Sequence, residues 1–323
     1  MKKYDFVVGG YVVANQFLRM NRLPQVGVTA WVTNDDYDKV FFGGPGLNIA
    51  YDLGKLGCRV LPVLSYVSDD KRAEIEALLA GVGETCEALE PPVPGSSGVA
   101  LMMQDECKNQ LTIACRNSAG MQTPPLREME DRWFRESRYA VLAIMLPQNV
   151  PEFLKRVKKN GVPLIFSMRA DEKIFPKEIL WDALTTAEII FMNDTEQDYL
   201  TALFGLDKSE ALFEAGNARV IATTCGKKGC VVRWKENDAV HEQIVPITDC
   251  GTCIDATGAG DAFVAGFLYG MVHDAPPELC AQYGSTAASF VIEQTGSLEN
   301  APTLEQMLRR NACRPDAPKE GML

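Results

Sequence analysis

The 323-residue sequence lacks several features that would assign it to a class at once. It has no internal repeat, no low-complexity tract and no apolar stretch near the roughly 20 residues that span a bilayer. Its formal net charge of -11 argues against general nucleic-acid binding, because neutralising phosphates requires clustered Lys and Arg. The opening residues lack the long apolar run and cleavage site of a secretory signal. We therefore expect a cytoplasmic protein that binds neither nucleic acid nor a membrane.

The apolar content is high enough for a large core. Hydrophobic residues make up 46% of the sequence, and short apolar runs alternate with amphipathic stretches, as in a doubly wound α/β sheet. The predicted parallel strands are 6–8, 60–64, 139–144, 164–166, 189–191 and 220–223. The predicted helices are 47–56, 71–79, 150–159, 195–204, 259–272 and 277–292. Such a fold places a ligand site at the carboxyl ends of the strands.

Two segments, 28–42 and 99–115, have strand-like alternation instead, and we expect them to form hairpins of a small projecting sheet. The expected organisation is one α/β domain over 1–313 with inserted lid segments, followed by a frayed tail. The lid segments are 11–42 and 97–116, and the tail is 314–323. A sheet with an apolar face and free edges needs a cover. The small sheet is therefore expected to close over substrate and to form a homodimer contact.

The most informative stretch is a glycine-rich turn at 255–261, Asp-Ala-Thr-Gly-Ala-Gly-Asp, which runs directly into an apolar helix. Unpaired backbone N–H groups at a helix start, flanked by small residues, can hold a phosphate. Asp261 would repel a resting phosphate, so its presence fits a base that takes a proton from an attacking hydroxyl. On these residues alone, an ordinary helix N-cap explains the pattern equally well.

This turn closely resembles the C-terminal signature of the ribokinase-like (PfkB) carbohydrate kinase family. Residues 41–57 resemble the family's N-terminal Gly-Gly motif, which opens a helix. Weaker matches are residues 193–196, with the family's Asn-x-x-Glu motif, and residues 224–229, with its Thr-x-Gly-x-x-Gly turn. The resemblance implies a three-layer α/β/α doubly wound, mostly parallel sheet with a small β-sheet lid. It also implies an ATP-dependent carbohydrate kinase that uses Mg²⁺.

The resemblance implies a role for each matched position. The catalytic positions are Asp261 as the base and Gly258, Ala259 and Gly260 as the amides of an anion hole. Asn193 and Glu196 match residues linked to Mg²⁺ and phosphate, with Glu196 acting through water, although a helix cap at Asn193 is an alternative. Asp255 and Thr257 match positions that hold a monovalent cation, such as K⁺, in many relatives. The positions implied beside the nucleotide are Thr224, Gly226 and Gly229.

The substrate side departs from known branches of the family. The implied substrate-binding positions are Asn15, Gly43, Gly44, Asn48, Arg116 and Arg169. Asn15 stands where ribokinases place an Asp, and an amide accepts hydroxyl hydrogen bonds more weakly than a carboxylate does. Pro45 stands in place of a ribokinase Lys, and Met145 or Leu146 in place of a Glu. True ribokinase activity is therefore disfavoured.

Two arginines resemble features of the fructokinase and 2-keto-3-deoxygluconate kinase branch. Arg116 lies in a segment that resembles the Arg-bearing lid of that branch, although a solvated hairpin charge is the alternative. Arg169 partly replaces the polar centre of the branch's Asp-x-Asn-x-Arg pattern. These matches leave the identity of a sugar or sugar-acid substrate open.

Four functional hypotheses follow, in order. The first is phosphorylation of a hydroxyl, expected to be primary, on a small sugar or sugar acid. The second is a nucleoside kinase, whose base would need a slot that Phe17, Trp31 and Phe42 could form, although core packing explains these residues equally well. The third, a catalytically silent sugar-binding or regulatory protein, is disfavoured because a binder gains nothing from Asp261. A dinucleotide oxidoreductase ranks last, since Gly9 and Gly10 lack the third spaced glycine.

Overall fold

Most strands of the main sheet are short runs rich in β-branched and aromatic residues that are buried on both faces, whereas the edge strand Ala239–Val245 is mostly exposed. The structure is a computed structural model that describes residues 2–65, 71–91, 99–107, 109–115 and 128–315. The eight strands lie in the order β12-β11-β10-β9-β8-β7-β1-β4. Their bounds are Tyr4–Tyr11 (β1), Val60–Ser65 (β4), Ser137–Leu142 (β7), Leu164–Ser167 (β8), Ala187–Asn193 (β9), Val220–Thr224 (β10), Cys230–Glu236 (β11) and Ala239–Val245 (β12).

The first six strands in chain order are parallel, as the alternating pattern predicts, while β11 and β12 form an antiparallel hairpin at one edge. The sequence analysis did not predict this hairpin. Its turn is made by Asn237 and Asp238, both of which have positive φ, and such a pair is a recognised hairpin signal.

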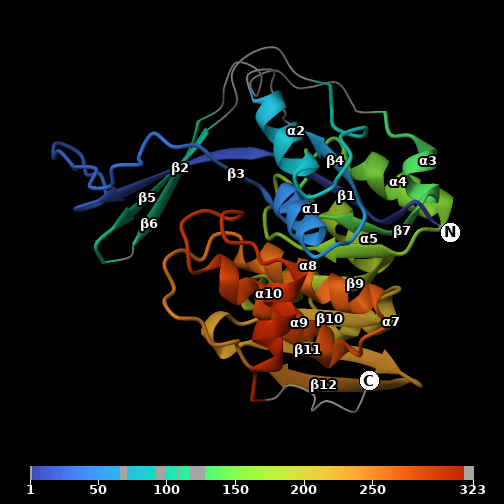
Figure 1. Cartoon of the computed structure of the whole chain (residues 1–323). Helices are drawn as coiled ribbons and strands as arrows, with labels where there is room; N and C mark the ends of the chain where they lie inside the picture. The colour runs from blue at the N-terminus through green and yellow to red at the C-terminus, as the bar shows by residue number, and fades with distance from the viewer. Residues whose placement is uncertain (1, 66–70, 92–98, 108, 116–127, 316–323) are drawn as a thin grey trace.

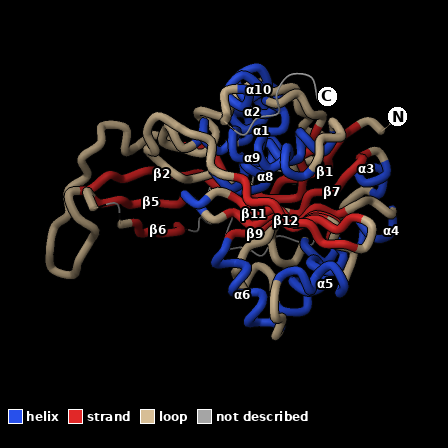
Figure 2. The backbone as a smooth tube through the Cα atoms, turned by 90° about the horizontal axis from the view of Figure 1, so that it is seen from below, coloured by secondary structure: helices blue, strands red, loops and turns tan. Residues whose placement is uncertain are grey.

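Helices cover both faces of this sheet, which gives the three layers visible in Figures 1 and 2. One face carries α1 (Pro45–Lys55), α8 (Ala259–Val272), α9 (Pro277–Val291) and α10 (Leu304–Ala312), and α2 (Arg72–Ala80) packs beside α1. The other face carries α3 (Asp131–Arg135), α4 (Val150–Asn160), α5 (Lys177–Thr186), α6 (Asp194–Phe204) and α7 (Leu212–Ala215). A separate buried cluster of apolar side chains lies on each face. Helix α8 begins at Ala259 and ends at Val272, as predicted.

A second sheet of four strands projects from the side of this body (Figures 1 and 2). Its strands lie in the order β3-β2-β5-β6, with bounds Val13–Met20 (β2), Phe41–Gly43 (β3), Val99–Asp105 (β5) and Gln110–Cys115 (β6). The hairpin expected within 99–115 is present as β5 and β6. We call this second sheet the lid sheet.

The expected hairpin at 28–42 was wrong. The long strand lies earlier, at Val13–Met20, and β3 contributes only its short final segment, while most of residues 21–40 form turns with isolated bridges. The run Asn34-Asp35-Asp36 explains the difference, because such residues bond to nearby backbone and favour turns over strands.

The start of the expected frayed tail is ordered. Arg314 is buried and donates hydrogen bonds to the Thr248 hydroxyl and to the Pro246 carbonyl, the latter at 3.0 Å. The rest of that tail beyond Pro315 lies outside the described residues. Within the described part of the chain, no helix combines the length and the apolar character that a membrane crossing requires.

Candidate active site

The start of α8 presents unpaired backbone amides. Its N-cap, Gly258, has φ 81°, a left-handed conformation that glycine adopts without strain. Within the described residues, the amides of Gly258, Gly260 and Asp261 have no hydrogen-bond acceptor. The amide of Ala259, by contrast, donates to the Ala256 carbonyl at 3.2 Å. The free amides are therefore not the expected set: that of Ala259 is occupied, and that of Asp261 takes its place.

The Asp261 carboxylate lies in the first turn of α8 and lines a pocket with Gly260. Its Oδ2 accepts a hydrogen bond of 2.6 Å from Asn48 Nδ2 in α1. Burial raises the pKa of Asp261 to about 6, while the Asn48 hydrogen bond and the positive charge of Arg169 lower it. A carboxyl group with this pKa is ionised near neutral pH yet still basic enough to accept a proton.

The predicted substrate positions Asn15, Gly43 and Gly44 lie around Asn48, which contacts this carboxylate. Asn48 Oδ1 accepts a hydrogen bond of 2.9 Å from Ser297 Oγ. Gly43 packs closely against Ser297 and Asn15. A Cβ added at this glycine would lie 2.8 Å from Ser297 Oγ and 2.9 Å from Asn15 Nδ2. Gly44 is the N-cap of α1. The Asn15 side chain is only 7% exposed, and among the described residues it has no hydrogen-bond partner, so its amide is available to a ligand.

On the other side of Asp261 the pocket reaches the carboxyl ends of β8, β9 and β10. Asn193 and Glu196 form a capping box at the start of α6: Asn193 Oδ1 accepts from the Glu196 amide, and Glu196 Oε2 accepts from the Asn193 amide, both at 2.8 Å. The helix-cap alternative for Asn193 is therefore confirmed. Burial raises the pKa of Glu196, while the Asn193 amide, the charge of Arg169 and a backbone hydrogen bond from Ala170 lower it.

The predicted nucleotide positions lie next to this capping box. Thr224 ends β10 and pairs in register with Asn193 of β9. The turn that follows is a short 3₁₀ segment, Gly226–Lys228, and Gly229 accepts a hydrogen bond from the Cys225 amide at 2.7 Å. Thr224 lines the same pocket as Asp261, whereas Gly226 and Gly229 lie beyond it.

The residues expected to hold a monovalent cation make other contacts. Asp255 Oδ1 accepts hydrogen bonds from the Thr257 amide at 3.0 Å and from its hydroxyl at 2.7 Å. Asp255 Oδ2 accepts from the Gly296 amide at 3.0 Å. These contacts brace the turn before α8 against a distant segment, and the cation role stays a prediction. For Mg²⁺, the buried Glu196 carboxylate has the oxygen chemistry that a hydrated hard cation needs.

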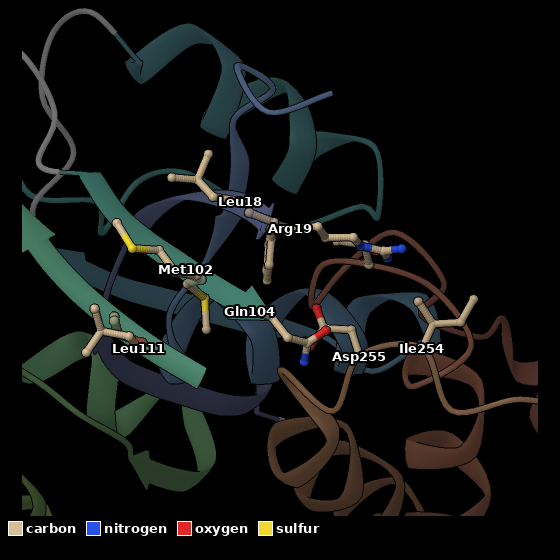
Figure 3. A pocket seen from close by; sticks show the side chains of 11 residues that line it. Leu18, Arg19, Met102, Gln104, Leu111, Ile254 and Asp255 are labelled. Atoms are coloured by element: carbon tan, nitrogen blue, oxygen red, sulfur yellow. The ribbon is translucent and has the colours of Figure 1, made fainter. Parts of the chain in front are cut away.

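A cleft separates the lid sheet from the loop that precedes α8 (Figure 3). Arg19 Nη2 donates to Thr295 Oγ1 at 2.8 Å and so joins the lid sheet to the body. Figure 3 shows Gln104 of the lid sheet on the side that faces Asp255. Apolar lining comes from Phe17 and Met102, which are paired in register on β2 and β5.

Two residues of the site escaped the sequence analysis. Ser297 holds Asn48 from a loop that carries no motif. Asp52, one helical turn after Asn48, is 2% exposed, and within the described part of the chain neither of its carboxyl oxygens has a hydrogen-bond partner. Burial, and then the nearby charge of Asp261, raise the pKa of Asp52 well above its usual value. Arg116 lies outside the described residues, so its predicted role stays a prediction.

Comparison with known proteins finds relatives along nearly the whole chain. Residues 32–304 match the pfkB family of carbohydrate kinases. The nucleoside kinase of Methanothermobacter thermautotrophicus is 23% identical over 314 residues, which is 95% of both chains. The solved structure of Methanocaldococcus jannaschii nucleoside kinase, 23% identical, superposes with a TM-score of 0.81 over 97% of this chain and 99% of that one. The structure of Arabidopsis thaliana ribokinase complexed with ribose and ATP is 22% identical and superposes with a TM-score of 0.77 over 95% of this chain and 98% of that one.

Proposed function

Because the chain belongs to the pfkB family of carbohydrate kinases, we propose that it transfers the terminal phosphate of ATP to an acceptor hydroxyl with Asp261 as the general base. The observation that carries this proposal is the start of α8, where the Asp261 carboxylate accompanies unpaired amides. An anion site and a base within one helical turn are the two groups that phosphoryl transfer requires. Reduced cysteines and the use of ATP suit the cytoplasm.

The proposed reaction moves one proton and one phosphoryl group. Asp261 takes the hydroxyl proton as the acceptor oxygen forms a bond to the terminal phosphorus, and the bond from that phosphorus to the bridging oxygen breaks, releasing ADP. The free amides of Gly258 and Gly260 stabilise charge on the transferring group. Mg²⁺, when bound, would offset phosphate charge, and Glu196 would hold it through water.

For the acceptor we propose a small sugar or sugar acid that presents a primary hydroxyl to Asp261. The unpaired amide of Asn15 supports this choice, because it can both donate to and accept from sugar hydroxyls. Gly43 lies against Asn15, and Asn48 is hydrogen-bonded to Asp261. The sugar ring of the acceptor would therefore be held between the lid sheet and α1.

A nucleoside acceptor is the second candidate, and the cleft in Figure 3 favours it. Phe17 and Met102 give the lid side of this cleft an apolar surface, while Gln104 offers an amide that can pair with polar atoms of a base. Phe17 lies two residues beyond Asn15 on the same strand and therefore on the same face of the sheet. A base attached to a bound ribose would reach this surface.

The deciding experiment is ADP release measured against matched panels of sugars, sugar acids and nucleosides. Asp261→Asn serves as the control, because it keeps the shape and removes the base, and its turnover should fall about 10²-fold or more. Turnover of sugars or sugar acids supports the first candidate, and turnover of nucleosides supports the second. If no acceptor is turned over while one still raises the melting temperature, the protein is a binder and the kinase proposal is wrong.

We also propose that two copies associate through the lid sheet. Strand β6 is an edge strand, and Leu111 and Ile113 on one face of it are 42% and 43% exposed. Free edges with exposed apolar side chains are normally covered. Sedimentation should therefore give a dimer that Ile113→Lys converts to a monomer, and a wild-type monomer at micromolar concentration would contradict this arrangement.

A further inference from the structure

Arg169 carries a positive charge in the pocket that holds the candidate base. It follows β8 by two residues, and it lines the pocket together with Glu196, Gly260 and Asp261. Among the described residues that line this pocket, Arg169 is the only Lys or Arg. Its side chain is 59% exposed, so the guanidinium group can change partners without disturbing the core.

The present partner of Arg169 is Glu196, and their contact is loose. Arg169 Nη1 lies 3.7 Å from Glu196 Oε1, which is too long for a hydrogen bond. Glu196 Oε2, in contrast, is fixed by the capping box at the start of α6. Arg169 is the exposed member of this pair and can leave, but the Glu196 carboxylate is buried and would then need another cation in its place. The capping box thus fixes Oε2 of Glu196, the backbone of Ala170 gives the carboxylate a further hydrogen bond, and Arg169 beside Oε1 is its exchangeable partner.

Charge balance indicates what displaces this pair. The pocket contains the carboxylates of Asp261 and Glu196 against the single guanidinium of Arg169. The terminal phosphate of ATP brings further negative charge next to Asp261, and a few amide dipoles at a helix start offset only part of it. A guanidinium fork matches two phosphate oxygens in geometry and in charge.

We propose that Arg169 leaves Glu196 when ATP binds and clamps the terminal phosphate, which frees Glu196 Oε1 for hydrated Mg²⁺. This inference rests on the proposed kinase function and gives Arg169 a different task from the acceptor contact that the sequence predicted. The proposed acceptor contacts Asn15 and Gly43 cluster with Ser297 around Asn48, and none of these residues lines the pocket that holds Arg169. Arg169 would act on the phosphoryl group that moves and not on the group that receives it.

The test compares Arg169→Gln and Arg169→Lys with the wild type. Titration calorimetry measures the affinity for ADP and for a non-hydrolysable ATP analogue, both with Mg²⁺. Arg169→Gln should weaken binding of the analogue about tenfold or more and leave ADP binding unchanged, because only the analogue has a terminal phosphate. With a turned-over acceptor, kcat should fall about 10²-fold or more at an unchanged acceptor KM. Arg169→Lys should restore part of the analogue affinity and part of kcat, since lysine keeps the positive charge but lacks the two-pronged geometry of the guanidinium group.

A matched control is Arg219→Gln. Arg219 makes a similarly loose ion pair, 3.8 Å from Glu188, and is 76% exposed, but it does not line this pocket. Arg219→Gln should change neither the affinity for ADP nor the affinity for the ATP analogue. An equal loss of ADP and analogue binding in Arg169→Gln, or a raised acceptor KM with normal analogue binding, would overturn the assignment. Failure of the wild type to phosphorylate any acceptor would instead refute the proposed function, and the calorimetric comparison would still test Arg169.

Discussion

Asn48 and Asp261, 213 positions apart in the sequence, are joined by a hydrogen bond of 2.6 Å from Nδ2 to Oδ2. The bond links the first turns of two helices, α1 and α8, that lie on the same face of the main sheet. Ser297 Oγ holds the other end of the Asn48 amide. The amide therefore has one orientation, and it fixes the direction in which the carboxylate points.

Removing this donor should change the pH dependence of catalysis. The Asn48 hydrogen bond lowers the pKa of Asp261, which burial sets at about 6, so Asn48→Ala should raise that pKa. A base is active when deprotonated, and the acid limb of the kcat/KM profile should therefore move to higher pH. Activity at pH 6 should fall more than activity at pH 8. Ser297→Ala keeps the Asn48 donor and should shift the acid limb less. Identical pH profiles for the wild type, Asn48→Ala and Ser297→Ala would contradict the role of Asn48 in setting the pKa of Asp261.

The two glycines at the start of α8 should respond differently to alanine. Gly258 has φ 81°, and a Cβ there would lie 2.5 Å from Ser297 Cβ, so Gly258→Ala should cost roughly 1–2 kcal/mol of stability from backbone strain alone. A Cβ on Gly260 meets no atom within 4 Å. Gly260→Ala should therefore melt near the wild-type temperature. Thermal unfolding checks the pair, and equal melting temperatures for the two variants would rule out this explanation.

Asp52 should make the protein less stable as the pH rises. Its pKa is raised in the folded state, so the folded protein binds a proton that the unfolded chain releases above about pH 4. Stability then falls as pH rises from the unfolded pKa towards the folded one. Asp52→Asn cannot ionise, so it should unfold at a higher temperature than wild type at pH 8 and at a similar temperature near pH 4. A pH-independent difference between the two proteins would show that ionisation of Asp52 is not the cause.

The capping box allows the structural role of Glu196 to be separated from its proposed role in Mg²⁺ binding. Glutamine serves in a capping box as well as glutamate does, so Glu196→Gln should retain the melting temperature while losing the charge that Mg²⁺ needs. Its kcat should fall, and the Mg²⁺ concentration for half-maximal rate should rise. Asn193→Ala, which removes the cap, should cost about 1 kcal/mol of stability. A Glu196→Gln protein with normal Mg²⁺ dependence would exclude this carboxylate from metal binding.

The parts of the fold set by local pattern could be predicted from the sequence. Helix α8 and the six parallel strands each carry their own periodicity, and the glycine-rich turn carries a recognisable motif. The strand Val13–Met20 was missed because Asn15, Gln16 and Arg19 interrupt its apolar alternation, and it is stabilised by pairing with β5, far along the chain.

Contacts between distant segments could not be predicted in this way. Ser297 has no local signal, and its link to Asn48 exists only once α1 and α8 pack together. The occupied amide of Ala259 depends on a carbonyl three residues earlier, which only the folded turn brings into reach. Asp52 resembles any polar residue on a helix until its burial is known.

The Arg19–Thr295 hydrogen bond has a consequence for how a ligand would enter. It ties the lid sheet to the loop that follows α9, and both residues line the cleft in Figure 3. An arriving molecule would have to exchange this bond for contacts of its own, so small or poorly matched compounds would gain too little to displace it. Selection among metabolites would then begin in this cleft, before any atom reaches the Asp261 carboxylate.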